Sequence, residues 1–119
     1  GCFTPTCSHH HLPGFLMQAD EILEKDVDRI ACIPVNDPFV MGAWGNAQGT
    51  GEKVLMLSDG NGAFAAASGM ELDLSGIGLG TRSLRYAAIL QDGVVEEIFI
   101  EPNPGKVDVA SSDKVLKAL

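Results

Sequence analysis

The segment GCFTPTCS, residues 1–8, carries the strongest local signal in this chain of 119 residues. Thr4 suits a helix cap, and Pro5 suits the first helical position, where its missing N–H would have no partner. Cys7 then falls in the first helical turn, where unpaired backbone N–H groups and the helix dipole favour negative charge. A thiol at such a position has a lowered pKa. The segment therefore predicts a reactive Cys7, with a small buried hydrophobic side chain as the alternative.

Composition bounds the class of protein before any further motif is considered. The formal net charge is −8 without any block of Lys or Arg, which argues against nucleic acid and anionic membrane surfaces as partners. No apolar run approaches the roughly 20 residues of a spanning helix, and no secretory signal pattern is present. The three Cys residues are an odd number, which indicates free thiols in a reducing compartment. We therefore expect a globular domain located in the cytoplasm.

Helical and strand patterns alternate along the first half of the chain, as in an α/β domain. The predicted elements are an amphipathic helix at 12–24, a buried strand at 27–35, a helix from Pro38 to about residue 45, a short strand at 53–57, a turn at 58–62 and one or two helical turns at 63–68. Asp37, directly before Pro38, is the candidate cap of the second helix.

The second half of the chain contains the clearest hairpin signal. Two β-rich runs, 85–90 and 94–101, flank the sequence Gln-Asp-Gly at 91–93, which is typical of a hairpin turn. Residues 70–81 alternate only weakly and contain several Gly, so we expect a loop there. Ser111 or Ser112 can cap a last helix that runs to the end of the chain.

Several spaced motifs resemble one known family. They are FTPTCS at 3–8, HLPGF at 11–15, PVNDPFV at 34–40 with Trp44 after it, and TRSLRY at 81–86 leading to QDGVV at 91–95. Together they resemble the peroxiredoxins, in the subfamily called type II in plants and type five in animals, in order over essentially the whole chain. The resemblance implies a thioredoxin-like α/β fold, a central mixed sheet flanked by helices, as a single domain over residues 1–119. It also implies an enzyme, a thiol peroxidase that reduces hydrogen peroxide and alkyl hydroperoxides.

The resemblance also implies roles for individual residues. Cys7 is the peroxidatic cysteine, and Thr4 supplies a hydroxyl that hydrogen-bonds the peroxide and the thiolate. Arg85 holds the thiolate as an anion and orients the peroxide. Arg82 does not match that position, so we expect a surface or interface charge there. Because the family is commonly dimeric, a homodimer is implied.

The family motif normally begins with a Pro three residues before Phe3, preceded by a strand and an N-terminal hairpin. That Pro would stand just before Gly1, so we expect a domain that is incomplete at its N-terminus and lacks the usual N-terminal strands. A targeting segment for an organelle would precede the same point.

The reductant is inferred from which cysteines are present. Some members of the subfamily resolve the sulfenic acid with a Cys near the C-terminus, but the matching stretch, residues 107–111, has none. Cys32 lies in a predicted strand and Cys2 stands where the family usually has Ala, so we expect both to be buried packing thiols. An external reductant is therefore expected, either glutathione with glutaredoxin or thioredoxin.

Other kinds of site are disfavoured by the sequence. His9, His10 and His11 are consecutive, so their side chains point around a helix and do not converge on a metal. The Gly-rich stretch 76–80 lacks the Gly-Lys-Ser/Thr ending of a phosphate loop, and no cofactor is predicted. A thioredoxin-like disulfide oxidoreductase would need a second Cys where His10 stands. The remaining alternative is a truncated binding or dimerisation module in which Cys7 is inert.

Overall fold

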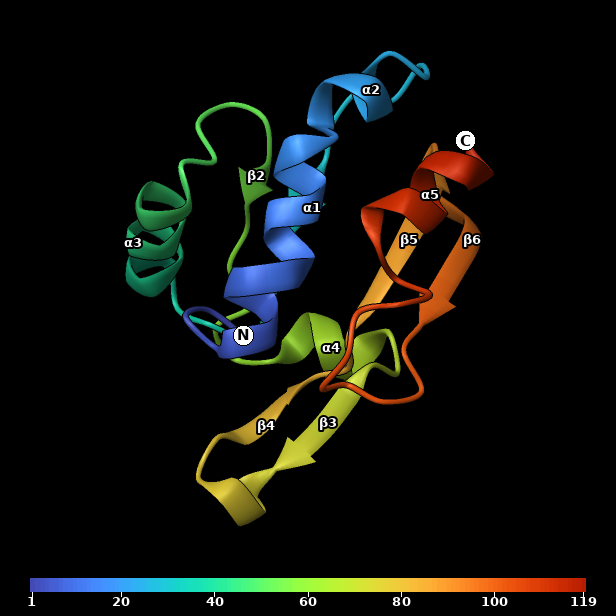
Figure 1. The fold of residues 1–119 in the computed structure, drawn as a ribbon. Coiled ribbons are helices and arrows are strands. Elements are labelled where there is room, and N and C mark those ends of the chain that lie inside the picture. Colours follow the sequence, from blue (N-terminus) through green and yellow to red (C-terminus); the bar gives the residue numbers. More distant parts are fainter.

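The first segment forms a helix that begins as its local sequence predicts. The computed structural model describes all residues, 1–119, and in it Pro5 and Thr6 are the first helical residues. A wider π-helical stretch, η1 (Cys7–His11), continues into α1 (Leu12–Met17) and α2 (Ala19–Leu23) (Figure 1). The helix predicted over 12–24 is therefore interrupted at Gln18, whose backbone leaves the helical region at φ −104° and ψ 9°.

The first two predicted strands form a parallel pair joined by a helix. β1 (Ala31–Cys32) pairs with β2 (Leu55–Met56), and each is shorter than the sequence predicts. The pairing extends beyond these residues through three backbone hydrogen bonds, including one from Leu57 N to Cys32 O at 2.8 Å. The connecting helix, α3 (Pro38–Gln48), is capped by the Asp37 carboxylate, which accepts a hydrogen bond from Val40 N at 2.8 Å. The predicted cap is therefore confirmed.

The loop predicted over 70–81 is wrong, because this stretch forms a hairpin. After the short helix α4 (Ala63–Ala67), β3 (Glu71–Leu74) pairs antiparallel with β4 (Gly80–Ser83) around the 3-10 turn η2 (Ser75–Ile77). Residues of β3 alternate between exposed and half-buried, so the weak alternation was a strand signal. The glycines belong to the connection, where Gly78 adopts a φ of 81° that favours glycine.

The last elements follow the sequence prediction closely. β5 (Tyr86–Gln91) and β6 (Val94–Ile100) form an antiparallel hairpin, and Asp92 and Gly93 both have positive φ values, 51° and 78°, as in a type I′ turn. α5 (Ser112–Ala118) is capped by Ser111, whose hydroxyl accepts a hydrogen bond from Lys114 N at 3.3 Å.

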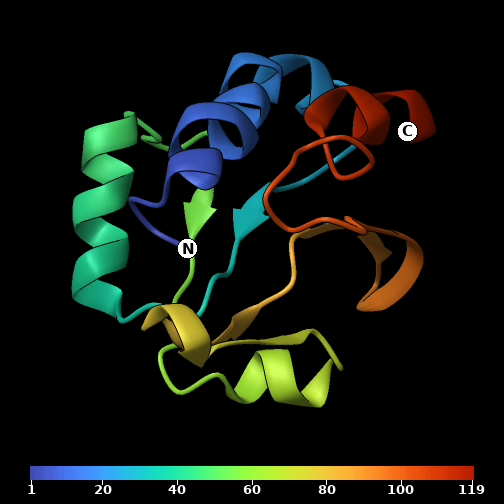
Figure 2. The ribbon, with the colours of Figure 1, turned by 60° about the horizontal axis from the view of Figure 1, so that its bottom comes forward.

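The strands are arranged as three separate two-stranded ladders flanked by helices, one parallel and two antiparallel. Figure 2 shows the β1–β2 ladder between α3 on one side and the β5–β6 hairpin on the other. The sequence predicted one central mixed sheet. Its parallel and antiparallel pairs are present, but β1 and β5 each pair on one edge only, and no backbone ladder joins β1 to β5. No helix is both long and apolar enough to cross a membrane.

The hydrophobic core lies beneath the start of the first helix. Its most buried members are Cys2, Leu12, Met41, Trp44 and Val54. These side chains come from the first segment, from α1, from α3 and from the approach to β2. Because Cys7 also packs against this cluster, the core fixes the position of the first helical turn.

Candidate active site

Two residues that are 78 positions apart in the chain meet at the start of the first helix. Arg85 precedes β5, and its Nη2 donates a hydrogen bond to Cys7 Sγ at 3.3 Å. The amino group of Gly1 lies 3.1 Å from the same sulfur. Both the thiol and the guanidinium are half-buried. The structure thus places the Arg85 guanidinium beside the sulfur, an arrangement that favours a thiolate.

Thr4 lies on the N-terminal side of Cys7, at the beginning of the same helix. Its backbone carbonyl accepts a hydrogen bond from Ser8 N at 2.9 Å, which closes the first helical turn. Its hydroxyl donates its single proton to Gly1 O in this structure. If the hydroxyl turns toward the sulfur, the same proton can instead stabilise the Cys7 thiolate, and this contact is one of the causes that lower the pKa of Cys7. The three residues named by sequence reasoning therefore gather at one point.

The pKa values separate the three thiols. Burial raises the pKa of Cys7, but the charge of the amino terminus, hydrogen bonds from Thr4 and that amino group, and the charge of Arg85 outweigh burial and hold it below the ordinary value. Burial raises the pKa of Cys2 to about 11 and that of Cys32 to about 12. No disulfide joins them. Cys7 is therefore the thiol most readily ionised near neutral pH.

Arg85 is held in place by contacts that sequence reasoning did not assign. Its Nε donates to Pro104 O at 3.2 Å, and its Nη1 lies 3.0 Å from His11 Nδ1. On the other side of the ring, His11 Nε2 lies 2.9 Å from Ala110 O. The only sequence signal for His11 was its place in the HLPGF motif, which carries no information about its partner.

Of the two alternatives predicted for Arg82, a surface or an interface charge, the structure disfavours a free surface charge, and the interface charge stays a prediction. It is half-buried, with Nε donating to Leu79 O at 2.7 Å and Nη1 donating to Val35 O at 3.1 Å. These carbonyls lie in the turn before β4 and in the segment after β1, so Arg82 ties the β3–β4 hairpin to the parallel ladder. The two carbonyl oxygens accept hydrogen bonds from the guanidinium N–H groups and so hold the Arg82 side chain against the protein.

The other two cysteines lie in the protein interior. Cys2 is 8% exposed, as predicted, and its Sγ lies 3.2 Å from Met41 Sδ. Cys32 is half-buried and packs against the same core cluster. Cys2 is therefore buried as expected, whereas Cys32 is only half-buried, in the same class as Cys7, and packs on the edge of the core.

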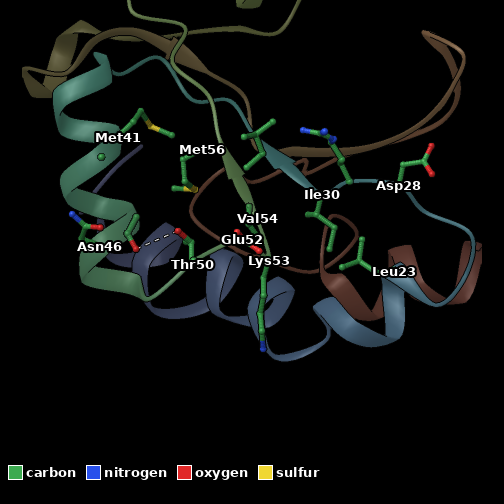
Figure 3. Close-up of a pocket in the computed structure, with 15 residues that line it drawn as sticks. Leu23, Asp28, Ile30, Met41, Asn46, Thr50, Glu52, Lys53, Val54 and Met56 are labelled. Carbon is green, nitrogen blue, oxygen red and sulfur yellow. Dashed lines mark hydrogen bonds between the residues drawn. The ribbon is translucent and has the colours of Figure 1, made fainter.

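A surface groove lies away from these residues. It has a volume of about 720 Å³ and runs between α3 and β2, with Met41, Asn46, Thr50, Val54 and Met56 among its lining residues (Figure 3). It contains none of the predicted site residues. No group of three or more His, Cys, Asp or Glu side chains is placed to hold a metal ion. The candidate chemistry therefore rests on the thiol and its immediate partners.

Comparison with known proteins places this fold and site in one class. Residues 1–116 match the model of the Redoxin family, and the thioredoxin-like α/β fold class is thereby confirmed. Among solved structures, reduced Prx3 of Vibrio vulnificus in complex with hydrogen peroxide has a TM-score of 0.94 and 48% identity, over 100% of this chain and 76% of that chain. The 1-Cys peroxiredoxin of Plasmodium falciparum has a TM-score of 0.93 at 30% identity, over 99% of this chain and 70% of that one.

Curated sequences narrow the class further. The chain is 47% identical to Peroxiredoxin-2B of Arabidopsis thaliana over 100% of its own length and 73% of the relative. It is 50% identical to Peroxiredoxin-2E, chloroplastic, of the same plant, again over its whole length. The chain belongs to the peroxiredoxins, in the type II subfamily. It spans about half the length of the chloroplastic relatives, 51% in the case of Peroxiredoxin-2E.

Proposed function

We propose that this chain carries the active site of a thiol peroxidase that reduces hydrogen peroxide and alkyl hydroperoxides through Cys7. The observation that carries the proposal is the 3.3 Å contact between Arg85 Nη2 and Cys7 Sγ. The pKa values support the same choice, because the thiol pKa is lowered at Cys7 and raised at Cys2 and Cys32. The related Vibrio vulnificus protein, whose structure was solved with hydrogen peroxide bound, supports the choice of substrate.

The reaction is a displacement on the O–O bond. The Cys7 thiolate attacks one oxygen and forms an S–O bond, and the O–O electron pair leaves with the second oxygen, which takes up a proton as water or alcohol. Cys7 is thereby oxidised to a sulfenic acid while the peroxide is reduced. Arg85 keeps its charge at any working pH, so it both favours the thiolate and stabilises charge on the leaving oxygen. The Thr4 hydroxyl is the proposed donor that orients the peroxide.

An external thiol is the proposed reductant of the sulfenic acid. The high pKa values of Cys2 and Cys32, about 11 and about 12, make both poor internal nucleophiles near neutral pH. Glutathione with glutaredoxin, or thioredoxin, is therefore proposed, together with a homodimer and a single domain over residues 1–119. The proposed compartment is the cytoplasm, with the chloroplast as the alternative that the names of two relatives supply. Sustained turnover with neither glutathione nor a dithiol protein present would contradict the external reductant.

The test compares peroxide consumption by the chain with that of two variants. In a stopped-flow assay without reductant, the chain should consume one equivalent of hydrogen peroxide, and Cys7→Ser should abolish this reaction. Cys32→Ser is the matched control, because it removes a thiol from the same core region without touching Arg85. If Cys7→Ser reacts as fast as the unchanged chain, Cys7 is inert and the chain is a binding or dimerisation module instead.

A further inference from the structure

A loop of residues 101–111 joins β6 to α5 and reaches the candidate active site through its backbone carbonyls (Figure 2). Pro104 O accepts a hydrogen bond from Arg85 Nε at 3.2 Å. Gly105 O accepts one from the hydroxyl of Thr6 at 3.1 Å. The loop therefore contacts both the arginine beside the sulfur and the helical turn that carries the reactive thiol.

One buried side chain holds the two halves of this loop together. Glu101 directly follows β6 and is 3% exposed. Its Oε1 accepts hydrogen bonds from Asp108 N at 2.6 Å and from Ala110 N at 2.7 Å. Burial of a carboxylate is unfavourable unless the carboxylate is hydrogen-bonded, so these two bonds favour one closed shape of the loop.

The same residue is also bonded to the main chain of Arg85. Glu101 N donates to Arg85 O at 3.0 Å, which extends the β5–β6 ladder by one pair beyond Tyr86 and Ile100. The backbone of Glu101 is thus fixed to the arginine, and its side chain is fixed to the far end of the loop. One residue therefore determines where the loop carbonyls lie relative to Arg85.

Glu101 can act on the site by its position or by its charge. Burial lowers the pKa of His11, and the negative charge of Glu101 partly opposes this shift. A role of the charge requires a carboxylate near the site but tolerates a small displacement of it. A role of the position requires an oxygen acceptor at the present distance from both N–H groups, with or without the charge.

We infer that Glu101 is a positioning residue for the peroxidase reaction, whose carboxylate oxygen holds the loop so that its carbonyls engage Arg85 and Thr6. The inference deepens the proposed function, on which it rests. Without this oxygen, two backbone N–H groups lose their acceptor and the loop opens to satisfy them elsewhere. The guanidinium and the first helical turn then lose the carbonyls that hold them in place.

Three substitutions at Glu101 separate position from charge. Glu101→Gln keeps the side-chain length and an oxygen acceptor but removes the charge. Glu101→Asp keeps the charge but is one methylene shorter, so its oxygen does not reach both N–H groups in the present shape of the loop. Glu101→Met keeps the length and removes both the acceptor and the charge.

Asp59→Leu is the matched control for a loss of stability. Asp59 is also buried, at 7% exposed, and its carboxylate accepts hydrogen bonds from Phe64 N and Ala65 N, both at 2.9 Å. These two N–H groups lie in the first turn of α4, away from the loop and from the contacts of Arg85. Asp59→Leu therefore removes a comparable buried acceptor and leaves the loop unchanged.

Three readouts are measured for each variant. They are the rate constant for Cys7 with hydrogen peroxide, the pH profile of Cys7 alkylation by iodoacetamide assigned by peptide fragmentation, and the unfolding temperature. We expect Glu101→Asp and Glu101→Met to react about tenfold more slowly with peroxide at pH 7, because a small misplacement of a catalytic group is sufficient for such a loss. Their alkylation midpoints should move to higher pH, because a displaced Arg85 stabilises the thiolate less.

The other two variants should keep their reactivity. Glu101→Gln should stay within about threefold of the unchanged chain in the rate constant and should keep its alkylation midpoint. Asp59→Leu should also stay within about threefold, although its unfolding temperature falls. If Glu101→Met does not fold, the comparison of Glu101→Asp with Glu101→Gln decides the question.

Three results would overturn the inference. A slow Glu101→Gln beside a normal Glu101→Asp would assign the effect to charge. A lower unfolding temperature of Glu101→Asp without a change in rate constant or alkylation midpoint would leave Glu101 a structural residue only. An equal loss of rate in Asp59→Leu and Glu101→Asp would make the effect a general consequence of lost stability.

The alkylation profile distinguishes a failure of this inference from a failure of the proposed function, because it needs no peroxide. If the unchanged chain does not consume hydrogen peroxide, the proposed function fails. An alkylation midpoint that is displaced in Glu101→Asp and unchanged in Glu101→Gln would still support the positioning role of Glu101.

Discussion

Replacing Arg85 by Met tests the central contact of the site most directly. Met retains the apolar length of the Arg side chain but removes the guanidinium that lies 3.3 Å from Cys7 Sγ. A hydrogen bond to a charged group contributes about 1.5–3 kcal/mol. The guanidinium stabilises the thiolate and the transition state by this amount but does not stabilise the neutral thiol. Its loss therefore raises the barrier from the thiol and slows the reaction about 10- to 150-fold at pH 7.

The matched control is Arg82→Met, which also removes one positive charge. Arg82 donates to Leu79 O and Val35 O and has no contact with Cys7. Both variants keep the amino group of Gly1 beside Cys7, so its effect cancels in the comparison. We expect Arg82→Met to change the rate by less than about threefold, because its charge acts only at a distance.

The single Trp of the chain offers the assay. Trp44 is 2% exposed, and its Nε1 donates to Ser8 Oγ at 3.0 Å, directly beside Cys7. Its fluorescence should follow oxidation of Cys7 in a stopped-flow experiment, with rates linear in hydrogen peroxide concentration. Equal rates for Arg85→Met and the unchanged chain, or equal losses in Arg85→Met and Arg82→Met, would refute the assignment of Arg85 as the partner of the thiolate.

Three further changes test the fold around the site. Burial raises the pKa of Cys2 from the ordinary 9.0 to about 11, so between these pH values the folded state keeps a proton that the unfolded state has lost. The free energy of unfolding should therefore fall with rising pH across this interval, by about 1.4 kcal/mol per pH unit. Urea unfolding at about pH 8 and about pH 10.5 should show a smaller fall for Cys2→Ala than for the unchanged chain. Asp37→Ala should cost about 1 kcal/mol by loss of the α3 cap, whereas Asp37→Asn should cost much less, because Asn also caps helices; an equal loss for both would contradict the capping role. Gly93→Ala should lower the free energy of unfolding by about 1 kcal/mol, because Gly93 has a φ of 78° that a side chain makes unfavourable. Gly42→Ala should raise it by up to about 1 kcal/mol, because Gly42 lies inside α3 with open space at the Cβ position. Thermal unfolding should show these opposite shifts.

The local signals in the sequence predicted the elements that depend on a few neighbouring residues. The helix start around Pro5, the Asp37 cap and the hairpin turn at Asp92 and Gly93 are all present. Such features are readable because caps and tight turns are decided by side chains within about four positions of the backbone that they stabilise. The β3–β4 hairpin was missed because its strands are partly exposed, so their alternation of apolar and polar residues is weak.

The sequence by itself placed Cys7 in the first turn of a helix, and the family motif named Thr4 and Arg85 as its partners. It could not separate Arg85 from Arg82 by chemistry, because both carry the same charge only three positions apart. The tertiary structure decided this, since Arg82 is engaged by Leu79 O and Val35 O, whereas Arg85 reaches the sulfur. The same holds for His11, which lies between Arg85 and the carbonyl of Ala110, a residue 99 positions away in the chain. Contacts at such separations follow from how the hairpin and the last loop pack on the first helix, which no local pattern encodes.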